Sequence, residues 1–469
     1  IGSVDVDSLG SDYSLTVHSK WTNLTPTEGA PLAALIVQHG ELDISNSVFA
    51  GSRNISDTTS EKNGGAIQTK GDSILKVDGS IFYDNQAKTY GGAIDIDGTN
   101  DKATITESVF IKNAADLHAG AIDIHSTDVQ LTDNSFYDNS APWGGAVYVH
   151  EGASTDITTT DTAYPTLFEA NKALEGGAIY GAATSDINIE GAVFNKNQAL
   201  STDSDAADGS AIYSAGVLTT KNSTFKNNEV TGSNALGGTV YIHENGSYVS
   251  TGDTFTANTV STDGGAVLNK GSVTMRQAKI TNNKAGSEGG GIYNTGIATV
   301  ASSTVSGNEA ARGGGIYNTG TATITNTTIS NNKATGNGGG IYNTGTLTLQ
   351  GSGNKLLTNT TGGVGSHVYN AAGGTLNIVN AKDDIDLDYA PYTNKTAPTN
   401  PNRLLSEEGD IYNGGTININ NSEKSNTDII LIGINAIYPA GTTVYIKNFI
   451  IPEYIFSGYV QNDISIVYV

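Results

Sequence analysis

The sequence has no cysteine, little proline and little positive charge, and each shortage excludes a class of structure or partner. Because no Cys occurs among the 469 residues, disulfide bonds, Cys-ligated metal sites and Cys nucleophiles are excluded. With only 9 Pro, the chain keeps the backbone N–H donors that long β-ladders need. A net charge of −23 argues against nucleic acids and anionic membrane surfaces as partners. No run of about 18 apolar residues occurs, so no membrane-spanning helix is expected.

What the sequence does contain is glycine, 58 residues in all, much of it in a short repeat. The octad Gly-Gly-Gly-Ile-Tyr-Asn-Thr-Gly at residues 289–296 recurs unchanged at 313–320 and 338–345, with offsets of 24 and 25 residues. So short and regular a period indicates stacked repeats, and it leaves no room for a helical crossover between parallel strands. The sequence therefore predicts an all-β solenoid, a single-stranded right-handed parallel β-helix of about 12–14 coils with end caps.

Each predicted coil is marked by the small residue that precedes the Ile or Val of the repeat. These positions are Ala34, Ala66, Ala93, Ala121, Ala146, Ala178, Ala211, Thr239, Ala266, Gly291, Gly315 and Gly340, and two degenerate coils are expected at His367 and Asp410. A second column runs from Phe49 to Phe255 and on to Leu356, and we expect it to stack inside the coils. An Asn follows three residues after each member from Phe82 onward. We expect these Asn to occupy left-handed turn positions and to bond the next coil.

The chain is expected to have three segments. Residues 1–33 do not fit the coil pattern and are predicted to form an N-terminal cap, because the open end of a β-helix exposes unpaired strands. Residues 34–380 hold the β-helix repeats, with inserted loops expected at 151–162 and 200–207. Residues 381–469 contain a linker, a last degenerate coil and an apolar β region that either caps the helix or assembles with another molecule.

Two tetrapeptides recur in pairs along the chain, Gly-Gly-Ala-Ile (or Val) and Phe-x-x-Asn. The intact pairs include 64–67 with 82–85, 91–94 with 110–113, 144–147 with 168–171, and 176–179 with 194–197. These motifs resemble the repeat of the chlamydial polymorphic outer-membrane proteins over residues 34–359. The resemblance implies an autotransporter passenger with a pectin-lyase-like β-helix that serves as a surface adhesin. The chain departs from the chlamydial members in having no Cys.

One group of acidic and His residues is placed on a common outer face by the coil register. If the Ile or Val of each repeat points inward, the residues one and three places later point outward. In three successive coils this rule selects Asp95, Asp97, Asp123, His125 and His150. Stacked carboxylates repel each other, so a divalent metal bound by Asp97, Asp123, His125 and His150 is one interpretation. A solvated acidic patch with partly protonated His is the other, and no further cofactor is expected.

Tyrosine occupies the same outward position in nine coils. The column reads Tyr148, Tyr180, Tyr213, Tyr241, Tyr293, Tyr317, Tyr342, Tyr369 and Tyr412, interrupted by Leu268. We expect the rings to stack into a flat aromatic strip, which makes Tyr180, Tyr213, Tyr293, Tyr317 and Tyr342 candidate residues for binding a glycan or a partner protein. Stacking that stabilises the β-helix without any ligand is the alternative interpretation.

The sequence lacks the residue clusters that β-helical polysaccharide enzymes use for catalysis. The only arginines are Arg53, Arg276, Arg312 and Arg403, and none falls in a coil-to-coil cluster of acids. The sequence therefore predicts a non-enzymatic extracellular adhesin that binds a cell-surface protein or glycan. A structural subunit that binds copies of itself into a filament, sheath or surface layer is the alternative, because open β-helix ends can propagate. A polysaccharide lyase or hydrolase is the second alternative.

Overall fold

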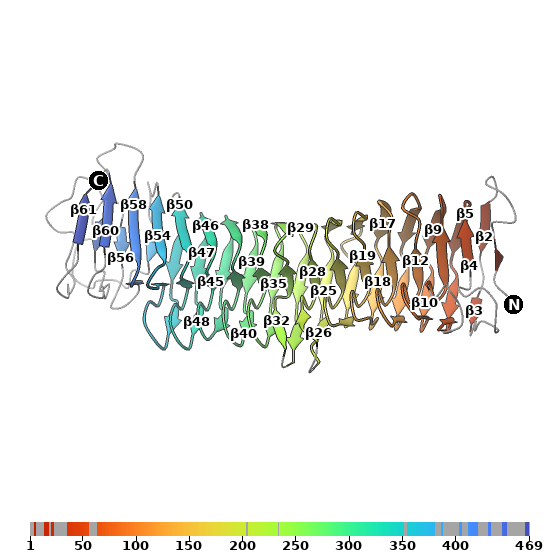
Figure 1. Ribbon diagram of the computed structural model, residues 1–469, viewed down its shortest axis with the longest axis horizontal. Coiled ribbons are helices and arrows are strands. Elements are labelled where there is room, and N and C mark those ends of the chain that lie inside the picture. Colours follow the sequence, from red (N-terminus) through yellow and green to blue (C-terminus); the bar gives the residue numbers. More distant parts are fainter. Residues whose placement is uncertain are drawn as a thin grey trace. The chain divides into compact units, whose positions relative to one another are not determined.

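The computed structural model contains only β-strands, turns and loops in the residues that it describes. These are residues 4–5, 14–17, 20–22, 35–55, 63–202, 205–232, 234–350, 354–379, 386–387, 403–405, 411–420, 430–432, 443–447 and 465–468. The chain divides into two compact units, residues 1–249 and 250–469. Within each unit short parallel strands repeat coil after coil, each strand pairing with its equivalents in the neighbouring coils (Figure 1). The predicted parallel β-helix is confirmed.

In the first unit four strands make one coil, and each belongs to a different parallel sheet. The first sheet contains β4 (Leu35–Gln38), β8 (Ile67–Lys70), β12 (Ile94–Ile96), β16 (Ile122–Ile124), β19 (Val147–Val149), β23 (Ile179–Gly181), β28 (Ile212–Ser214) and β33 (Val240–Ile242). The second contains β5 (Glu41–Ser45), β9 (Ile74–Asp78), β13 (Lys102–Thr106), β17 (Asp128–Thr132), β20 (Ser154–Thr158), β24 (Asp186–Glu190) and β29 (Val217–Lys221). The third contains β6 (Val48–Ala50), β10 (Ile81–Tyr83), β14 (Val109–Ile111), β18 (Ser135–Tyr137), β21 (Leu167–Glu169), β25 (Val193–Asn195) and β30 (Thr224–Lys226). Two- and three-residue strands such as β11 (Gln86–Ala87) and β26 (Gln198–Leu200) complete the coils.

The second unit repeats this arrangement. Its first sheet contains β37 (Val267–Asn269), β41 (Ile292–Asn294), β45 (Ile316–Asn318), β49 (Ile341–Asn343), β53 (Val368–Asn370) and β57 (Ile411–Asn413). Its second contains β38 (Ser272–Arg276), β42 (Ile297–Ala301), β46 (Thr321–Thr325), β50 (Thr346–Gln350), β54 (Thr375–Val379) and β58 (Thr416–Asn420). Its third contains β35 (Thr254–Thr256), β39 (Lys279–Thr281), β43 (Thr304–Ser306), β47 (Thr328–Ser330), β51 (Lys355–Leu357) and β55 (Asp386–Leu387).

The predicted Phe column forms the core of the first unit. Phe82 pairs in register with Phe49 before it and with Phe110 after it, and the pattern continues to Phe225. Adjacent rings stack 4.7–5.0 Å apart between centroids. Each Phe is fully buried, so the column combines burial of apolar area with aromatic contact. In the second unit the smaller Ile280, Val305 and Ile329 occupy this column.

The predicted Asn column forms a hydrogen-bonded ladder in each unit. Asn113 shows the pattern, since its Nδ2 donates to Asn139 Oδ1 at 3.0 Å and to the carbonyl of Phe82 at 3.0 Å. The expected left-handed conformation is wrong for the ladder residues themselves. The preceding residue takes it instead, for example Lys112 (φ 54°) and Ala170 (φ 58°). The bend therefore falls one residue earlier, which leaves the Asn side chain pointing into the coil where its amide is fully bonded. A second Asn ladder runs along the first sheet of the second unit, from Asn269 to Asn413.

Strands at both chain ends also pair with the coils. β1 (Val4–Asp5), β2 (Ser14–Val17) and β3 (Lys20–Thr22) pair in parallel with β4, β5 and β6. The expectation that residues 1–33 lie outside the coil pattern is therefore wrong for these strands. β60 (Thr443–Lys447) and β61 (Ser465–Tyr468) likewise extend the second sheet beyond β58. The assignment of either end as a cap stays a prediction, and Ala34 and Asp410 lie outside the described residues.

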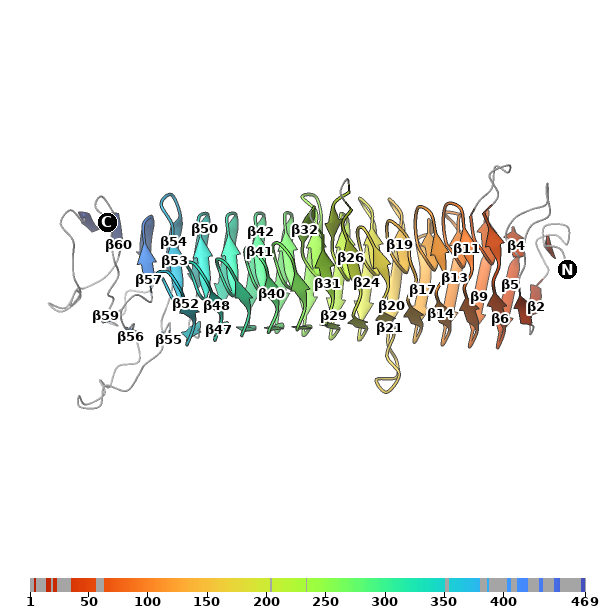
Figure 2. The same ribbon diagram turned by 90° about the horizontal axis from the view of Figure 1, so that it is seen from below.

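One loop projects from the side of the first unit. It connects β20 with β21 and covers residues 159–166 (Figure 2). An insertion was expected at 151–162, but Ser154–Thr158 is a strand that pairs with its neighbours on both sides. The extra residues therefore lie later than the composition indicated. In this loop Tyr164 is 77% exposed, which sets it apart from the buried tyrosines of the coils.

Candidate metal centre

The residue after the Ile or Val of each first-sheet strand forms a continuous column in each unit, which we call the outer column. It reads Gln68, Asp95, Asp123, Tyr148, Tyr180, Tyr213 and Tyr241 in the first unit, and Leu268, Tyr293, Tyr317, Tyr342, Tyr369 and Tyr412 in the second. The chain enters most of these strands through a left-handed glycine such as Gly176 (φ 64°). A Cβ there would lie 2.2 Å from the carbonyl oxygen of Ile179, so glycine is strongly favoured at this turn.

The residue before that turn lies beside the outer column, and we call these residues the covering column. In the first unit it contains Tyr90, His118, Trp143, Glu175 and Asp208, joined by parallel bridges. In the second unit it contains Asp263, Glu288, Arg312 and Asn337. The Arg312 guanidinium, for example, lies 5.5 Å from the ring centre of Tyr317 and 5.3 Å from that of Tyr342. Side chains of the outer column are therefore covered although they point away from the coil interior.

The outer tyrosines stack as predicted but do not form an exposed strip. Successive ring centroids lie 4.5–5.0 Å apart from Tyr148 to Tyr241. Tyr213, Tyr317 and Tyr342 are 6–8% exposed, and Tyr180 and Tyr293 are half-buried. The expectation of a flat exposed surface is wrong because the covering column packs over these rings. Burial raises the pKa of Tyr180 to about 12. Binding of a partner by these five tyrosines stays a prediction.

Three coils of the first unit carry shorter polar residues in the outer column. Gln68, Asp95 and Asp123 pair in register, and both Asp side chains are 0% exposed. Because Asp is much smaller than Tyr, room remains between the strands and the covering column. His118 occupies it, with its ring stacked on Tyr148 at 4.1 Å and on Tyr90 at 4.8 Å. An imidazole thus continues the aromatic stack above two buried carboxylates.

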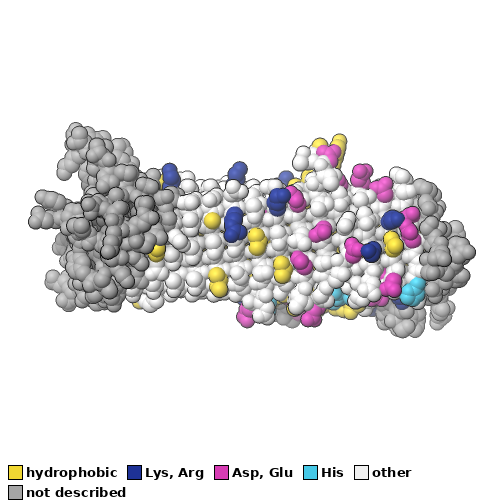
Figure 3. Space-filling view, turned by 90° about the horizontal axis from the view of Figure 1, so that it is seen from above, with side chains coloured by type: hydrophobic (Ala, Val, Ile, Leu, Met, Phe, Trp, Pro, Cys, Tyr) yellow, Lys and Arg dark blue, Asp and Glu magenta, His cyan; other side chains and the backbone are white. Residues whose placement is uncertain are grey.

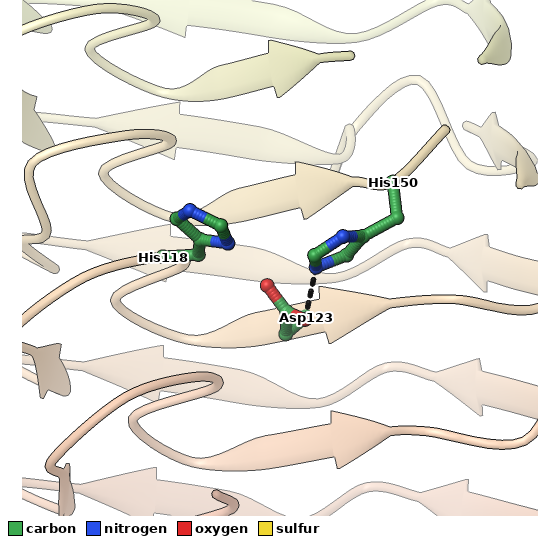
Figure 4. Close-up of side chains that lie close together, drawn as sticks. All are labelled: His118, Asp123 and His150. Carbon is green, nitrogen blue, oxygen red and sulfur yellow. Dashed lines mark hydrogen bonds and ion pairs between the residues drawn. The ribbon is translucent and has the colours of Figure 1, made fainter. Parts of the chain in front are cut away.

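Asp123 lies at the centre of this cluster (Figure 4). Its Oδ2 is hydrogen-bonded to Nε2 of His150 at 2.7 Å and lies 3.0 Å from Nε2 of His125. The rings of His125 and His150 stack with centroids 3.5 Å apart. The Oδ1 atom of Asp123 has no hydrogen-bond partner within the described residues, and in Figure 4 a carboxylate oxygen points towards His118. The carboxylate therefore joins imidazoles on two sides.

Asp95 is the second buried carboxylate, one coil away. Its Oδ2 accepts a hydrogen bond from Nε2 of Gln68 at 3.0 Å. Its Oδ1 is 4.0 Å from Nε2 of His125 and, among the described residues, has no hydrogen-bond partner. A buried polar atom without a partner carries a desolvation cost of about 1–3 kcal/mol, and more if it is charged. The cluster therefore holds buried donor and acceptor capacity that the protein alone leaves unused.

Burial and neighbouring charges shift the two carboxylates in opposite directions. Burial, reinforced by the charges of Asp123 and Asp97, raises the pKa of Asp95 well above its usual value. Burial alone would do the same to Asp123, but its contacts with His125 and His150 outweigh that effect and lower the pKa of Asp123. Asp123 is therefore the member of the pair that ionises at the lower pH.

The pKa values of His118 and His125 are also shifted in opposite directions. Burial lowers the pKa of His118 to about 4, because the ring is enclosed between Tyr90 and Tyr148 and lies near two other His. Burial also acts against protonation of His125, but its contact with Asp123 and the charge of Asp97 raise the pKa of His125 overall. His118 is thus a neutral imidazole at pH 7, ready to act as an acceptor or a ligand, whereas the contact with Asp123 favours the protonated form of His125.

Two overlapping sets of residues bring potential ligand atoms within 4.8 Å of one another. One contains His118, Asp123 and His150, and the other contains Asp95, Asp123 and His125. Of the predicted metal residues, Asp123, His125 and His150 are therefore together. Asp97 is half-buried beside them and belongs to neither set. Imidazole nitrogen and carboxylate oxygen are ligands that zinc and similar transition metals accept.

Sequence reasoning left out two members of the cluster. Asp95 was placed on the correct face but not among the ligands, and His118 was missed. The signal for His118 was its place directly before Ala119-Gly120-Ala121, where other coils have Gly-Gly-Ala. Ala119 takes the same left-handed conformation (φ 54°) as the first glycine elsewhere. Reading the residue before each such turn as a column of its own would have brought His118 next to Asp123.

Comparison with known protein families agrees with this architecture. A right-handed β-helix region is recognised at residues 65–260, and the Chlamydia polymorphic membrane protein repeat at residues 278–295 and 326–344. No curated protein and no solved structure matches the chain significantly. Within the described residues, no helix is long and apolar enough to cross a membrane. This chain is therefore a right-handed parallel β-helix protein that carries the Chlamydia polymorphic membrane protein repeat.

Proposed function

We propose that this chain is a non-enzymatic β-helix displayed outside the cell, where it adheres to a protein or glycan on another cell. The observation that carries the proposal is the polymorphic membrane protein repeat at residues 278–295 and 326–344, within a chain that also contains a right-handed β-helix region. The repeat is named for membrane proteins, and the resemblance of the paired tetrapeptides implies a passenger that acts as an adhesin.

The placement of the acidic cluster supports a non-enzymatic role. β-Helical polysaccharide enzymes act through carboxylates that reach a substrate on the outer surface. Asp95 and Asp123 are instead 0% exposed beneath the covering column, where a sugar chain does not contact them. On the face shown in Figure 3, the acidic side chains of the described residues are scattered, several of them beside a Lys or Arg, and they form no continuous patch. Adhesion by this surface would therefore rely on individual exposed side chains and loops.

The loop of residues 159–166 is the feature of the first unit best placed for such contact. Its Tyr164 is 77% exposed, and the backbone N–H of this residue donates to the carbonyl of Asp161 at 3.0 Å, which orders the turn. Tyr provides a large contact area at little conformational cost, and this explains its frequency in interfaces. We therefore place the adhesive contact at this loop rather than at the covered tyrosines of the coils.

The test measures adhesion of the complete chain and of a Tyr164→Ala variant. Fluorescently labelled protein would be applied to cultured cells and to a glycan array. We expect saturable binding that falls at least about tenfold in the variant, as for truncation of a central interface tyrosine. Tyr83→Ala is the matched control, because Tyr83 is also exposed (44%) but lies on strand β10. Absence of saturable binding by the unaltered chain on every surface would refute the proposal.

The alternative of a self-assembling subunit is favoured by one observation. β61 is paired on one side with β60, and it is the last described strand of its sheet. A β-strand of one copy can add to a sheet of another, and contacts of this kind between copies propagate into filaments. Electron microscopy of the chain at increasing concentration would reveal regular polymers if self-assembly is its function. Single particles that bind cells would favour the adhesin.

A further inference from the structure

We propose that the cluster around Asp123 binds one divalent transition-metal ion of the zinc class, with Asp123, His118 and His150 as its protein ligands. This inference does not depend on the adhesive function proposed above. It rests on the spacing of the ligand atoms, on buried polar atoms that have no partner, and on the way the aromatic stack holds His118.

The spacing of the donor atoms suits a small ion. Each of the three residues offers one atom, and these atoms all lie within 4.8 Å of one another. Two ligands that are each about 2.0–2.1 Å from a tetrahedral zinc ion lie about 3.3 Å apart. The 2.7 Å between His150 Nε2 and Asp123 Oδ2 therefore has to open only slightly when an ion replaces the shared proton. Figure 4 shows the three side chains converging from neighbouring coils.

Unpartnered atoms provide an independent reason to expect a ligand. Among the described residues, Oδ1 of Asp123, Oδ1 of Asp95 and Nδ1 of His118 are buried without a hydrogen-bond partner. Both carboxylates are fully buried, so bulk water does not solvate these oxygens. Native proteins rarely leave such atoms unsatisfied, and an ion is one of the few partners that meets several at once.

The fold holds His118 ready for coordination. Its ring is stacked between Tyr90 and Tyr148, with only 3° between the planes of His118 and Tyr148. Stacking uses the faces of the ring, whereas the nitrogen lone pairs lie in its plane and remain available to a metal. Neighbours that fix the orientation of a ligand in this way strengthen metal binding.

Charge and ligand type together select the class of ion. Asp95 and Asp123 pair in register on adjacent coils, and a +2 ion would balance the negative charge of the buried Asp123 carboxylate. Two imidazoles with one carboxylate suit zinc, cobalt, nickel or copper, whereas calcium and magnesium favour sites made entirely of oxygen. His150 is 18% exposed, which leaves a short path by which the ion can enter.

The test uses the complete chain, freed of metal with a chelator and then titrated with Zn²⁺ in a calorimeter. We expect one equivalent to bind and the thermal midpoint to rise with zinc concentration. Asp123→Asn keeps the shape of the side chain and should weaken binding at least about 100-fold, whereas His118→Ala and His150→Ala should each weaken it at least about tenfold. With Co²⁺ in place of Zn²⁺, intense visible bands should report nitrogen and carboxylate ligands in a low-coordinate site.

His243→Ala is the matched control for His150→Ala. His243 stands two residues after Tyr241, as His150 stands two residues after Tyr148, but no acidic residue occupies the outer column there. This variant should bind zinc like the unaltered chain. Circular dichroism in zinc-free buffer would establish that Asp123→Asn is folded. The proposal is wrong if the unaltered chain binds no zinc, or if folded Asp123→Asn binds it equally well.

Discussion

The outer column of the first unit has two contrasting stretches. From Tyr148 to Tyr241 it is a stack of identical rings, and from Gln68 to Asp123 it is a pair of buried carboxylates with an amide. The backbone is the same in both, since the strands pair in register throughout. The covering column also differs between the two stretches. His118 lies beside the short Asp123, whereas Glu175 lies beside the tyrosines. The same repeat therefore encodes either a stack or a polar site.

The contrast shows that a change of residue type in the outer column requires a matching change in the covering column. A carboxylate in the outer column is buried by the coil geometry whether or not it has a partner. A buried charge without a partner is strongly destabilising, so an Asp at this position requires imidazoles from the covering column and from the strand end. In the first unit His118, His125 and His150 provide them.

The largest effect is expected from placing a carboxylate where no imidazole accompanies it. Tyr213→Asp would remove a stacked ring between Tyr180 and Tyr241 and leave a buried acid near Glu175 and Asp208. We expect a loss of about 5 kcal/mol in the free energy of unfolding, from lost packing and an unpaired buried charge. Urea unfolding followed by circular dichroism would measure it.

Tyr213→Phe is the control for that substitution. It keeps the stack and removes only the hydroxyl, so its cost should stay near 1 kcal/mol. If Tyr213→Asp and Tyr213→Phe unfold at the same urea concentration, the outer column at this coil is not buried in solution, and the contrast between the two stretches fails.

The converse change places a ring where the site has its carboxylate. Asp123→Tyr would meet His118, which already occupies the stack 4.1 Å from Tyr148. Overfilling a packed region costs about 1–3 kcal/mol, and we expect about 2–3 kcal/mol here. Adding His118→Ala should recover at least half of the loss, because the new tyrosine can then take the place of the imidazole. Thermal unfolding of the two single variants and the double variant would give the coupling between these sites.

If the losses from Asp123→Tyr and His118→Ala simply add, the two side chains do not compete for one space. The exchange of Tyr for the Asp and His pair would then not explain how one repeat forms two kinds of coil.

Periodicity was sufficient to predict the interior of the coils from the sequence. The Phe column, the Asn ladder that follows it and the stacking of the outer tyrosines all follow from residues repeated at a fixed offset, because parallel coils bring equivalent residues into register. Phe82, for example, pairs with Phe49 and Phe110 as the spacing predicts. Such columns need no knowledge of how the turns are shaped.

The features that could not be predicted from the sequence depend on the geometry of the turns. The burial of Tyr213 and Tyr317 follows from a left-handed glycine that brings the preceding residue over the strand, and the alternation of a strand does not show this. His118 was missed for the same reason, since it lies in the covering column rather than on a strand. The shift of the left-handed residue from Asn113 to Lys112 is likewise decided by turn geometry. The residues of the candidate metal site come from both strands and turns. The periodicity of the strands therefore predicted only some of them.

The second unit offers a milder version of the same contrast, in which an acid lies in the covering column. Burial raises the pKa of Asp263 to about 6, and the positive charge of Arg312 opposes this shift. A carboxyl whose folded pKa is raised stabilises the fold below its unfolded pKa, and the contribution is lost as pH rises through the folded value. Between pH 4 and 6.5 we therefore expect Asp263 to account for a loss of about 1–3 kcal/mol. Asp263→Asn should remove that loss, as measured by urea unfolding at a series of pH values. An unchanged pH profile in the variant would contradict the assignment.

The smallest effect is expected from Arg312, which covers the tyrosines of the second unit. Its guanidinium lies over the rings of Tyr317 and Tyr342, and it also pairs with Glu288. Because the Arg312 side chain is 47% exposed, the ion pair contributes little, and the cation–π contacts provide about 0.5–1 kcal/mol. Arg312→Ala should lower the urea midpoint by that small amount, whereas Arg276→Ala, which removes an exposed arginine on β38, should leave it unchanged. Equal effects of the two variants would mean that Arg312 does not act through the tyrosines, and that the stack of the second unit is stabilised by its rings alone.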